Sequence, residues 1–302
     1  MAASLMDGAA GRRRREAPYI AATLPAAAIL ALFFVTPAIW AIGTSLTDRA
    51  LIQSETNWIG FDNYRVLWNN PDFPKFIRNS ISFILGAAVI GETGFGLALA
   101  LLIDHATRRR YRLAGLAYAA VLAAWICPPA LAGAIWGEIY VYGFRDGPLN
   151  LALKTLGLPR IDMLGRNPML SVVIAEVWRG TAFAMVIFLG ALQMVPRSIY
   201  EAARVDGAGA WRQFLDHTIP SIRHALALVL LMTTIVAMGS FLLILILTNG
   251  DPGLQTETLA LFAYHTAFEP FQIGYGAAIA VVMLAANLLF ALVYLRLTRM
   301  RG

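Results

Sequence analysis

Charged residues are scarce in this chain of 302 residues: they make up 14% of it, whereas an ordinary soluble domain carries about a quarter. Cys127 is the single cysteine, which excludes a disulfide framework and any zinc or iron site with several cysteine ligands. The sequence also lacks the G-x-x-x-x-G-K-[ST] phosphate-binding motif and the H-E-x-x-H zinc motif. These absences argue against a soluble enzyme, against ATP hydrolysis by this chain and against a metal site.

The sequence contains long runs of apolar residues that have few or no charges. Hydrophobic residues make up 59% of the chain, and its mean hydropathy is +0.65. A helix needs about 20 mostly apolar residues to cross a bilayer, and backbone amides in lipid must bond within their own segment. The sequence therefore predicts an all-α polytopic membrane protein with six transmembrane helices, at about residues 18–47, 81–103, 113–137, 168–196, 225–248 and 273–295.

Positive charge is unequal on the two sides of this bundle. With both termini in the cytoplasm, the inner segments carry 15 Lys and Arg residues and the outer segments carry eight. Positive charge favours the cytoplasmic side, so the count predicts an N-in, C-in topology and explains the net charge of +6 without nucleic acid. Residues 1–17 form a basic tail that we expect to be disordered, and residues 18–302 the transmembrane domain. The first run is too long for a cleaved signal sequence.

The segment at residues 197–220, between the fourth and fifth spans, has helical order of its own. Ser198 and Glu201 have the spacing of a capping box that begins a short helix. Gly207 and Gly209 can form a sharp turn, because glycine accepts a positive φ. Three apolar side chains then share one face of a second short helix: Trp211, Phe214 and Leu215. We expect two short helices that are bent about a glycine and face the cytoplasm.

Part of this segment carries a family resemblance. Glu201-Ala-Ala, three residues and then Gly207, followed by a run that ends in Thr218-Ile-Pro220, resembles the EAA loop of permease subunits in binding-protein-dependent ABC importers. His217 and Ile219 depart from the isoleucine and leucine that are usual there. The resemblance implies that a cytoplasmic ATPase binds the short helices through Glu201, Ala202, Ala203, Arg204, Gly207, Trp211, Arg212 and Phe214.

Further motifs are similar to those of carbohydrate-type permeases, such as the maltose and glycerol-3-phosphate importers. They are Trp58-Ile-Gly-Phe-Asp-Asn-Tyr64, Asn79-Ser80, Gly147-Pro-Leu-Asn150, Thr248-Asn-Gly-Asp-Pro252, Thr256-Glu-Thr258 and Gly274-Tyr-Gly-Ala-Ala278. The resemblance implies a bacterial inner-membrane protein that forms half of a pore with a second, homologous permease. Two ATP-binding cassette subunits and an external solute-binding protein would complete the complex. ATP and Mg²⁺ would bind the ATPase subunits, and this chain would bind no cofactor.

Three charged residues lie within predicted spans: Glu92, Glu176 and Arg179. A charge at mid-bilayer is costly, so such residues face a bundle interior or water. Glu176 and Arg179 are three residues apart and can neutralise each other; alternatively they line the solute path, with Trp178 as a stacking surface for a sugar ring. For Glu92 we favour a contact with the second permease.

Two isolated polar residues are further candidates for the solute path, although both also fit ordinary helix packing. Ser240 lies in the middle of the fifth predicted span and Asn287 in the sixth. Cys127-Pro-Pro129 predicts a kink in the third span and an inert thiol.

Other functions are less well supported. An intramembrane enzyme would need a catalytic group, but Gly43-Thr-Ser45 lacks the glycine that completes a nucleophile motif, and His265 has no serine partner in the pattern. No catalytic residue is therefore predicted. A self-contained secondary transporter usually shows two comparable halves. An ABC importer permease for a solute other than a sugar remains the alternative.

Overall fold

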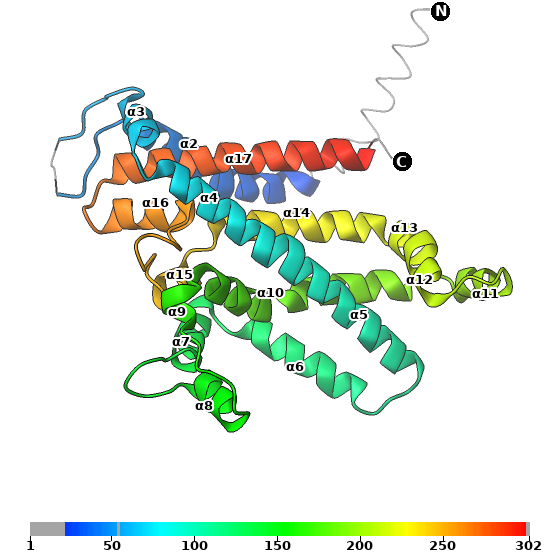
Figure 1. The fold of residues 1–302 in the computed structure, drawn as a ribbon. Helices are drawn as coiled ribbons and strands as arrows, with labels where there is room; N and C mark the ends of the chain where they lie inside the picture. The colour runs from blue at the N-terminus through cyan, green and yellow to red at the C-terminus, as the bar shows by residue number, and fades with distance from the viewer. Residues whose placement is uncertain (1–21, 53–54, 300–302) are drawn as a thin grey trace, which may run out of the picture.

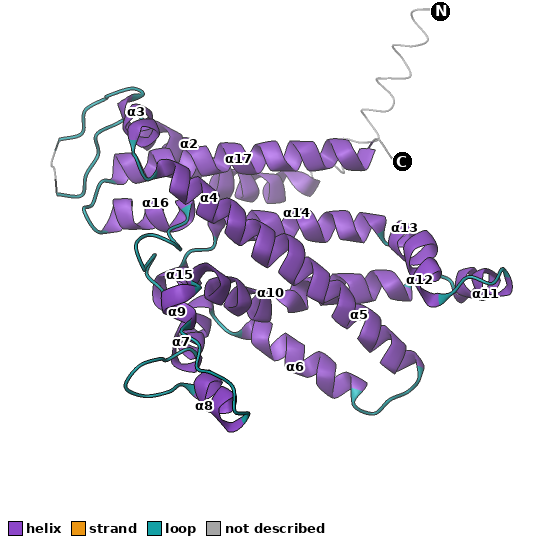
Figure 2. Ribbon diagram, viewed as in Figure 1, coloured by secondary structure: helices purple, strands orange, loops and turns teal. Residues whose placement is uncertain are grey.

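The structure is a computed structural model that describes residues 22–52 and 55–299. The predicted tail at residues 1–17 and the beginning of the first predicted span lie outside the described residues. Within the described ranges the chain is helical, and the only β pairing is an isolated bridge between Thr47 and Trp58 (Figure 2). The predicted all-α class is confirmed.

The helices run in chain order as follows, with three π-helical stretches marked η. They are η1 (Ala31–Val35), α2 (Thr36–Ser45), α3 (Asp62–Asn69), α4 (Phe73–Phe83), η2 (Ile84–Glu92), α5 (Thr93–Arg108), α6 (Ala114–Ile126), α7 (Pro129–Ile139), α8 (Pro148–Thr155), α9 (Met163–Arg166), α10 (Pro168–Gln193), α11 (Arg197–Val205), α12 (Ala210–Gln213), η3 (Phe214–Thr218), α13 (Ile219–Ser221), α14 (Arg223–Gly239), α15 (Leu242–Leu247), α16 (Leu259–Phe268) and α17 (Ile273–Arg299).

Four helices in the described residues are long and apolar enough to cross a membrane: Ala22–Ser45, Phe73–Arg108, Pro168–Gln193 and Ile273–Tyr294. Two further spans are possible if each of two bent helix pairs counts as one, namely α6 with α7 and Ala210–Ser221 with α14. The structure thus contains four to six candidate spans.

The second span is longer than predicted. Instead of residues 81–103, α4, η2 and α5 form one continuous helix of 36 residues, Phe73–Arg108. It packs along α10, and glycines allow the close approach: a Cβ atom on Gly96 would lie 2.5 Å from Cβ of Ala184. This contact between η2–α5 and α10 forms the centre of the bundle.

The third span is broken rather than kinked. The chain turns by 105° between α6 and α7 at Cys127 and Pro128, both of which precede a proline and have extended backbone angles. The helical region is disfavoured for a residue before proline, so two such residues in succession favour the end of the helix here. The predicted kink is therefore a near-perpendicular turn.

The fifth span is also interrupted, which corrects the continuous helix predicted over residues 225–248. Helix α14 ends at Gly239, and the chain resumes at Leu242 in the six-residue α15. Helix α15 packs against α7, where a Cβ atom on Gly133 would lie 2.9 Å from the carbonyl oxygen of Leu243. The two broken spans therefore meet.

The connections are divided between the two ends of the bundle (Figure 1). Helices α11–α13, the α5–α6 loop and the last turns of α17 lie at one end. Helices α3, α8 and α9 and the α16–α17 connection lie at the other. Segment 197–220 thus shares its end of the bundle with the arginine-rich loop after α5.

Candidate functional site

Segment 197–220 forms two short helical arms that meet at Gly207. Helix α11 ends at Val205, and Gly207 has a φ of +77°. The amide of Ala208 donates to the carbonyl of Ala203 (2.9 Å), and the amide of Gly207 donates to the carbonyl of Arg204 (3.1 Å). This pair of bonds is the Schellman motif, which needs a left-handed residue at the position of Gly207. Gly207 therefore makes the predicted turn.

The beginning of α11 differs from the prediction. Its N-cap residue is Pro196, and no side chain caps it. Because the helix begins at Arg197, Ser198 lies inside the first turn and cannot act as the N-cap of a capping box. Gly209 likewise does not take a left-handed conformation, since it has a φ of −64° as the N-cap of α12.

The two arms are held together by side-chain contacts. The hydroxyl groups of Tyr200 on α11 and Thr218 on η3 lie 3.2 Å apart, and Thr218 is buried. Nε2 of Gln213 donates to the carbonyl of Ala208 at 2.7 Å, which ties the second arm to the turn. The angle between the arms is therefore fixed by hydrogen bonds as well as by Gly207.

The base of the segment is embedded in the bundle. Val195 and Ile222 flank it in sequence and are both buried in an apolar cluster with Phe188 and Leu192 of α10 and Val229 of α14. From the neighbouring helix, Nη2 of Arg108 donates to the carbonyl of Leu192 (3.3 Å) while Nε of Arg108 pairs with Asp104 (2.6 Å). A rotation of the arms would therefore move the ends of α10 and α14 with them.

The outer surface of the segment is uncovered. Trp211 is 71% exposed and its ring lies 5.5 Å from that of Phe214, which is half-buried. Ala203 on α11 is buried. The remaining residues predicted to contact an ATPase are exposed: Glu201, Ala202, Arg204, Gly207 and Arg212. The segment presents an aromatic and charged surface beyond the apolar bundle.

The charged residues within the spans form a buried cluster. Glu176 is 1% exposed and pairs with Arg179 one turn away on α10. The two residues form the ion pair that their spacing allows. Both interact electrostatically with Glu92, which is 6% exposed. A Cβ atom on Gly180 would lie 2.2 Å from Oε1 of Glu92. Glu92 therefore packs against α10 of its own chain.

The candidates for the solute path do not all come together. Trp178 on α10 is 39% exposed, and its ring makes an edge contact with Trp136 of α7 at 5.9 Å. Ser240 lies at the break after α14. Asn287 lies on α17, which packs mainly against α2 and α16, and its Oδ1 is buried without a partner among the described residues.

At the opposite end, residues of the motifs Asn79-Ser80 and Thr256-Glu-Thr258 form a polar network that secures the loop before α16. Nδ2 of Asn79 donates to the carbonyls of Leu254 (2.8 Å) and Glu257 (2.9 Å). The Glu257 carboxylate contacts Nδ1 of His265 at 2.9 Å and is 2% exposed. Burial raises the pKa of Glu257 above its usual value, although His265 opposes this. In the sequence, the motif Thr256-Glu-Thr258 was the signal that could have pointed to this network.

Known proteins share this architecture. The family of binding-protein-dependent transport system inner membrane components matches residues 19–301. The chain belongs to this family. The sulfoquinovosyl glycerol transport system permease protein SmoG of Agrobacterium fabrum is 32% identical over 278 residues, which cover 91% of this chain and 88% of the relative. The trehalose/maltose transport system permease protein MalF of Thermococcus litoralis is 30% identical over 282 residues, 92% of each chain.

A solved structure of a bacterial alginate ABC transporter, in complex with an alginate pentasaccharide-bound periplasmic protein, contains a chain with the same fold. The TM-score is 0.78, with 96% of each chain covered and 19% identity. The resemblance to carbohydrate-type permeases is thereby confirmed at the level of family and fold. In this chain, the EAA motif forms α11 and the turn at Gly207.

Proposed function

We propose that this permease forms one half of the solute path in an ATP-driven importer for a sugar or sugar derivative. The relatives named above are described as permeases for sulfoquinovosyl glycerol and for trehalose and maltose. The observation that carries the proposal is the bent segment 197–220. It combines an exposed aromatic and charged surface with a base buried between α10 and α14.

The proposed topology has six spans with both termini in the cytoplasm. It is supported by the distribution of 15 and eight Lys and Arg residues between the two sides. Segment 197–220 lies at the same end of the bundle as the α5–α6 loop and the last turns of α17 (Figure 1). This placement agrees with the proposed topology. In this orientation α11–α13 face the cytoplasm, and the α16–α17 connection faces outward.

Transport is proposed to begin when two partner ATPases bind ATP and Mg²⁺ and close. The exposed side chains of Glu201, Arg204 and Trp211 supply their contact on this chain. Because Val195 and Ile222 anchor the segment in the bundle, displacement of α11 carries the ends of α10 and α14 with it. Such a rigid-body movement is a hinge or shear transition between inward-facing and outward-facing states.

The proposed solute path runs along the broken spans, between this chain and a second, homologous permease. Non-helical backbone at membrane depth is tolerated only where it is covered by protein or lines a water-filled cavity. The breaks at Cys127–Pro128 and at Ser240–Phe241 therefore favour a path beside them, with Trp178 as an aromatic surface for a sugar ring. An external solute-binding protein delivers the solute to the outward-facing loops.

Charge reversal at Glu201 tests the coupling role. In cells that contain the whole importer, Glu201→Lys should abolish uptake of the transported sugar and prevent co-purification of the ATPase, while the chain still inserts at normal levels. Glu138→Lys, which reverses an exposed carboxylate at the opposite end of the bundle, is the matched control for co-purification of the ATPase. Normal uptake by Glu201→Lys would contradict the proposal.

A further inference from the structure

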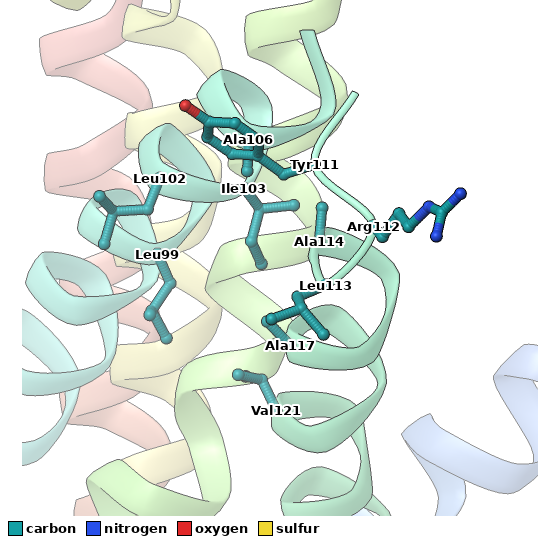
Figure 3. Close-up of a pocket in the computed structure, with 10 residues that line it drawn as sticks. All are labelled: Leu99, Leu102, Ile103, Ala106, Tyr111, Arg112, Leu113, Ala114, Ala117 and Val121. Atoms are coloured by element: carbon teal, nitrogen blue, oxygen red, sulfur yellow. The ribbon is translucent and has the colours of Figure 1, made fainter. Parts of the chain in front are cut away.

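A groove between α5 and α6 takes no part in the proposed transport step. It has a volume of about 520 Å³ and lies where the two helices approach their connecting loop (Figure 3). Eight of its ten lining residues are aliphatic: Leu99, Leu102, Ile103, Ala106, Leu113, Ala114, Ala117 and Val121. The remaining two, Tyr111 and Arg112, belong to the loop at its mouth.

The mouth of the groove carries Arg112, which belongs to an arginine-rich loop. Figure 3 shows the guanidinium of Arg112 directed away from the aliphatic side chains, and the Tyr111 ring above Ala106. Arg108 is paired with Asp104, but Arg109, Arg110 and Arg112 have no ion pair with any residue that the structure describes. Arg112 and Tyr111 thus lie at one end of an apolar slot, and Arg109 and Arg110 belong to the same loop.

This arrangement matches an amphipathic anion. Tyrosine is enriched where hydrocarbon meets the polar headgroups, and arginine side chains extend toward the same level. From Leu99 to Ala106 the groove extends about 10 Å along α5, which is within one leaflet of about 15 Å. Basic pockets between transmembrane helices on the cytoplasmic side bind anionic headgroups.

We infer that the groove binds one acyl chain of an anionic phospholipid, whose phosphate lies against the guanidinium of Arg112, with the positive charges of Arg109 and Arg110 in the same loop. The aliphatic walls accept the chain by ordinary burial of apolar surface, and the arginines select the headgroup. A helix of a second permease would fill the slot but leave these three charges uncompensated unless it supplied carboxylates. The inference depends on the proposed topology, with both termini in the cytoplasm, only in placing the lipid in the inner leaflet.

Lipid retention by the full-length chain tests the inference without any transport measurement. The protein is purified in mild detergent with phosphatidylglycerol or phosphatidylcholine, and bound lipid is counted by native mass spectrometry. We expect one retained phosphatidylglycerol, weaker retention of phosphatidylcholine, and no displacement by inorganic phosphate. Since a basic residue near an anionic headgroup is worth about fivefold in affinity, Arg112→Gln should weaken binding by about that factor.

Two matched pairs of variants separate the groove from general effects. Ala117→Phe fills the slot and should abolish retention, whereas Ala119→Phe places the same ring on the exposed opposite face of α6. Arg223→Gln removes an exposed arginine at the same end of the bundle and should change nothing. Equal retention in Ala117→Phe and Ala119→Phe would overturn the inference, as would equal binding of the two lipids.

The assembled importer provides a second measurement. A photo-crosslinking amino acid at position 117 should label phospholipid in the native membrane. A crosslink to the second permease instead would show that the groove is a subunit contact, and the inference would be wrong. Because neither outcome depends on solute uptake, failure here is distinguishable from failure of the proposed function.

Discussion

The turn at Gly207 offers a sharp test, because Gly207 and Gly209 lie two residues apart and differ in backbone conformation. At Gly207 a Cβ atom would meet nothing within 4 Å, so the only penalty for a side chain is the φ of +77°. A left-handed conformation costs an L residue about 1–2 kcal/mol. Gly209 has a φ of −64° and is the N-cap of α12, a position that favours serine. Gly207→Ser should therefore destabilise the turn, and Gly209→Ser should not.

Hydrogen exchange in lipid nanodiscs measures this difference directly. The amides of residues 207 and 208 donate the two bonds that close the turn. A penalty of 1–2 kcal/mol corresponds to a loss of protection of about 5-fold to 30-fold in Gly207→Ser. Gly207→Asn should lose less, since asparagine tolerates the left-handed region. If the amides of residues 207 and 208 exchange at the same rate in Gly207→Ser and in Gly209→Ser, the left-handed backbone of Gly207 does not stabilise the turn, and the reasoning is refuted.

Three further predictions concern the contacts around the segment, the buried charges and the outer loop. Tyr200→Phe removes the hydrogen bond to Thr218 and should lower protection of the second arm by about 1 kcal/mol, again by hydrogen exchange. Arg179→Met leaves buried Glu176 unpaired and should lower stability by about 3–5 kcal/mol in thermal unfolding, whereas the double variant Glu176→Gln/Arg179→Met should recover most of it; no recovery would contradict the pairing. Because the pKa of Glu257 is raised in the folded chain, its contribution to stability is fully present below its ordinary pKa of about 4.5 and is lost as the pH rises through the raised value. Glu257→Gln should therefore raise the thermal midpoint at neutral pH and lose that advantage below pH 4.5 or so; the same gain at both pH values would count against the burial argument.

The features that could be predicted from the sequence are those fixed by nearby residues. The turn at Gly207 follows from a local motif, and the pairing of Glu176 with Arg179 follows from their spacing on one helix. The apolar runs located the candidate spans, because the length of a membrane helix is set by the bilayer. Each of these depends on fewer than ten consecutive residues or on composition alone.

The features that were missed depend on contacts between distant residues. Glu92 is buried inside the chain because Gly180, on another helix, leaves room for its carboxylate. Asn79 secures a loop 175 residues away in the sequence. The break at Ser240 is invisible to hydropathy, since Leu242–Leu247 is as apolar as a continued span. The helix that begins at Arg197 shows that a capping-box pattern does not determine where a helix starts when a proline precedes it.

The unbroken helix Phe73–Arg108 has a mechanical consequence. At about 1.5 Å per residue, its 36 residues form a rod of about 54 Å, well beyond the thickness of the hydrocarbon core. One tip is attached through Arg108 to the end of α10, and near the other tip Lys75 and Asn79 bind the loop before α16. A tilt of about 10° about its midpoint would shift the two tips by about 5 Å in opposite directions. In the proposed transport cycle, a lever of this kind would transmit a movement at the end of α10 to the loop before α16 at the opposite end of the bundle.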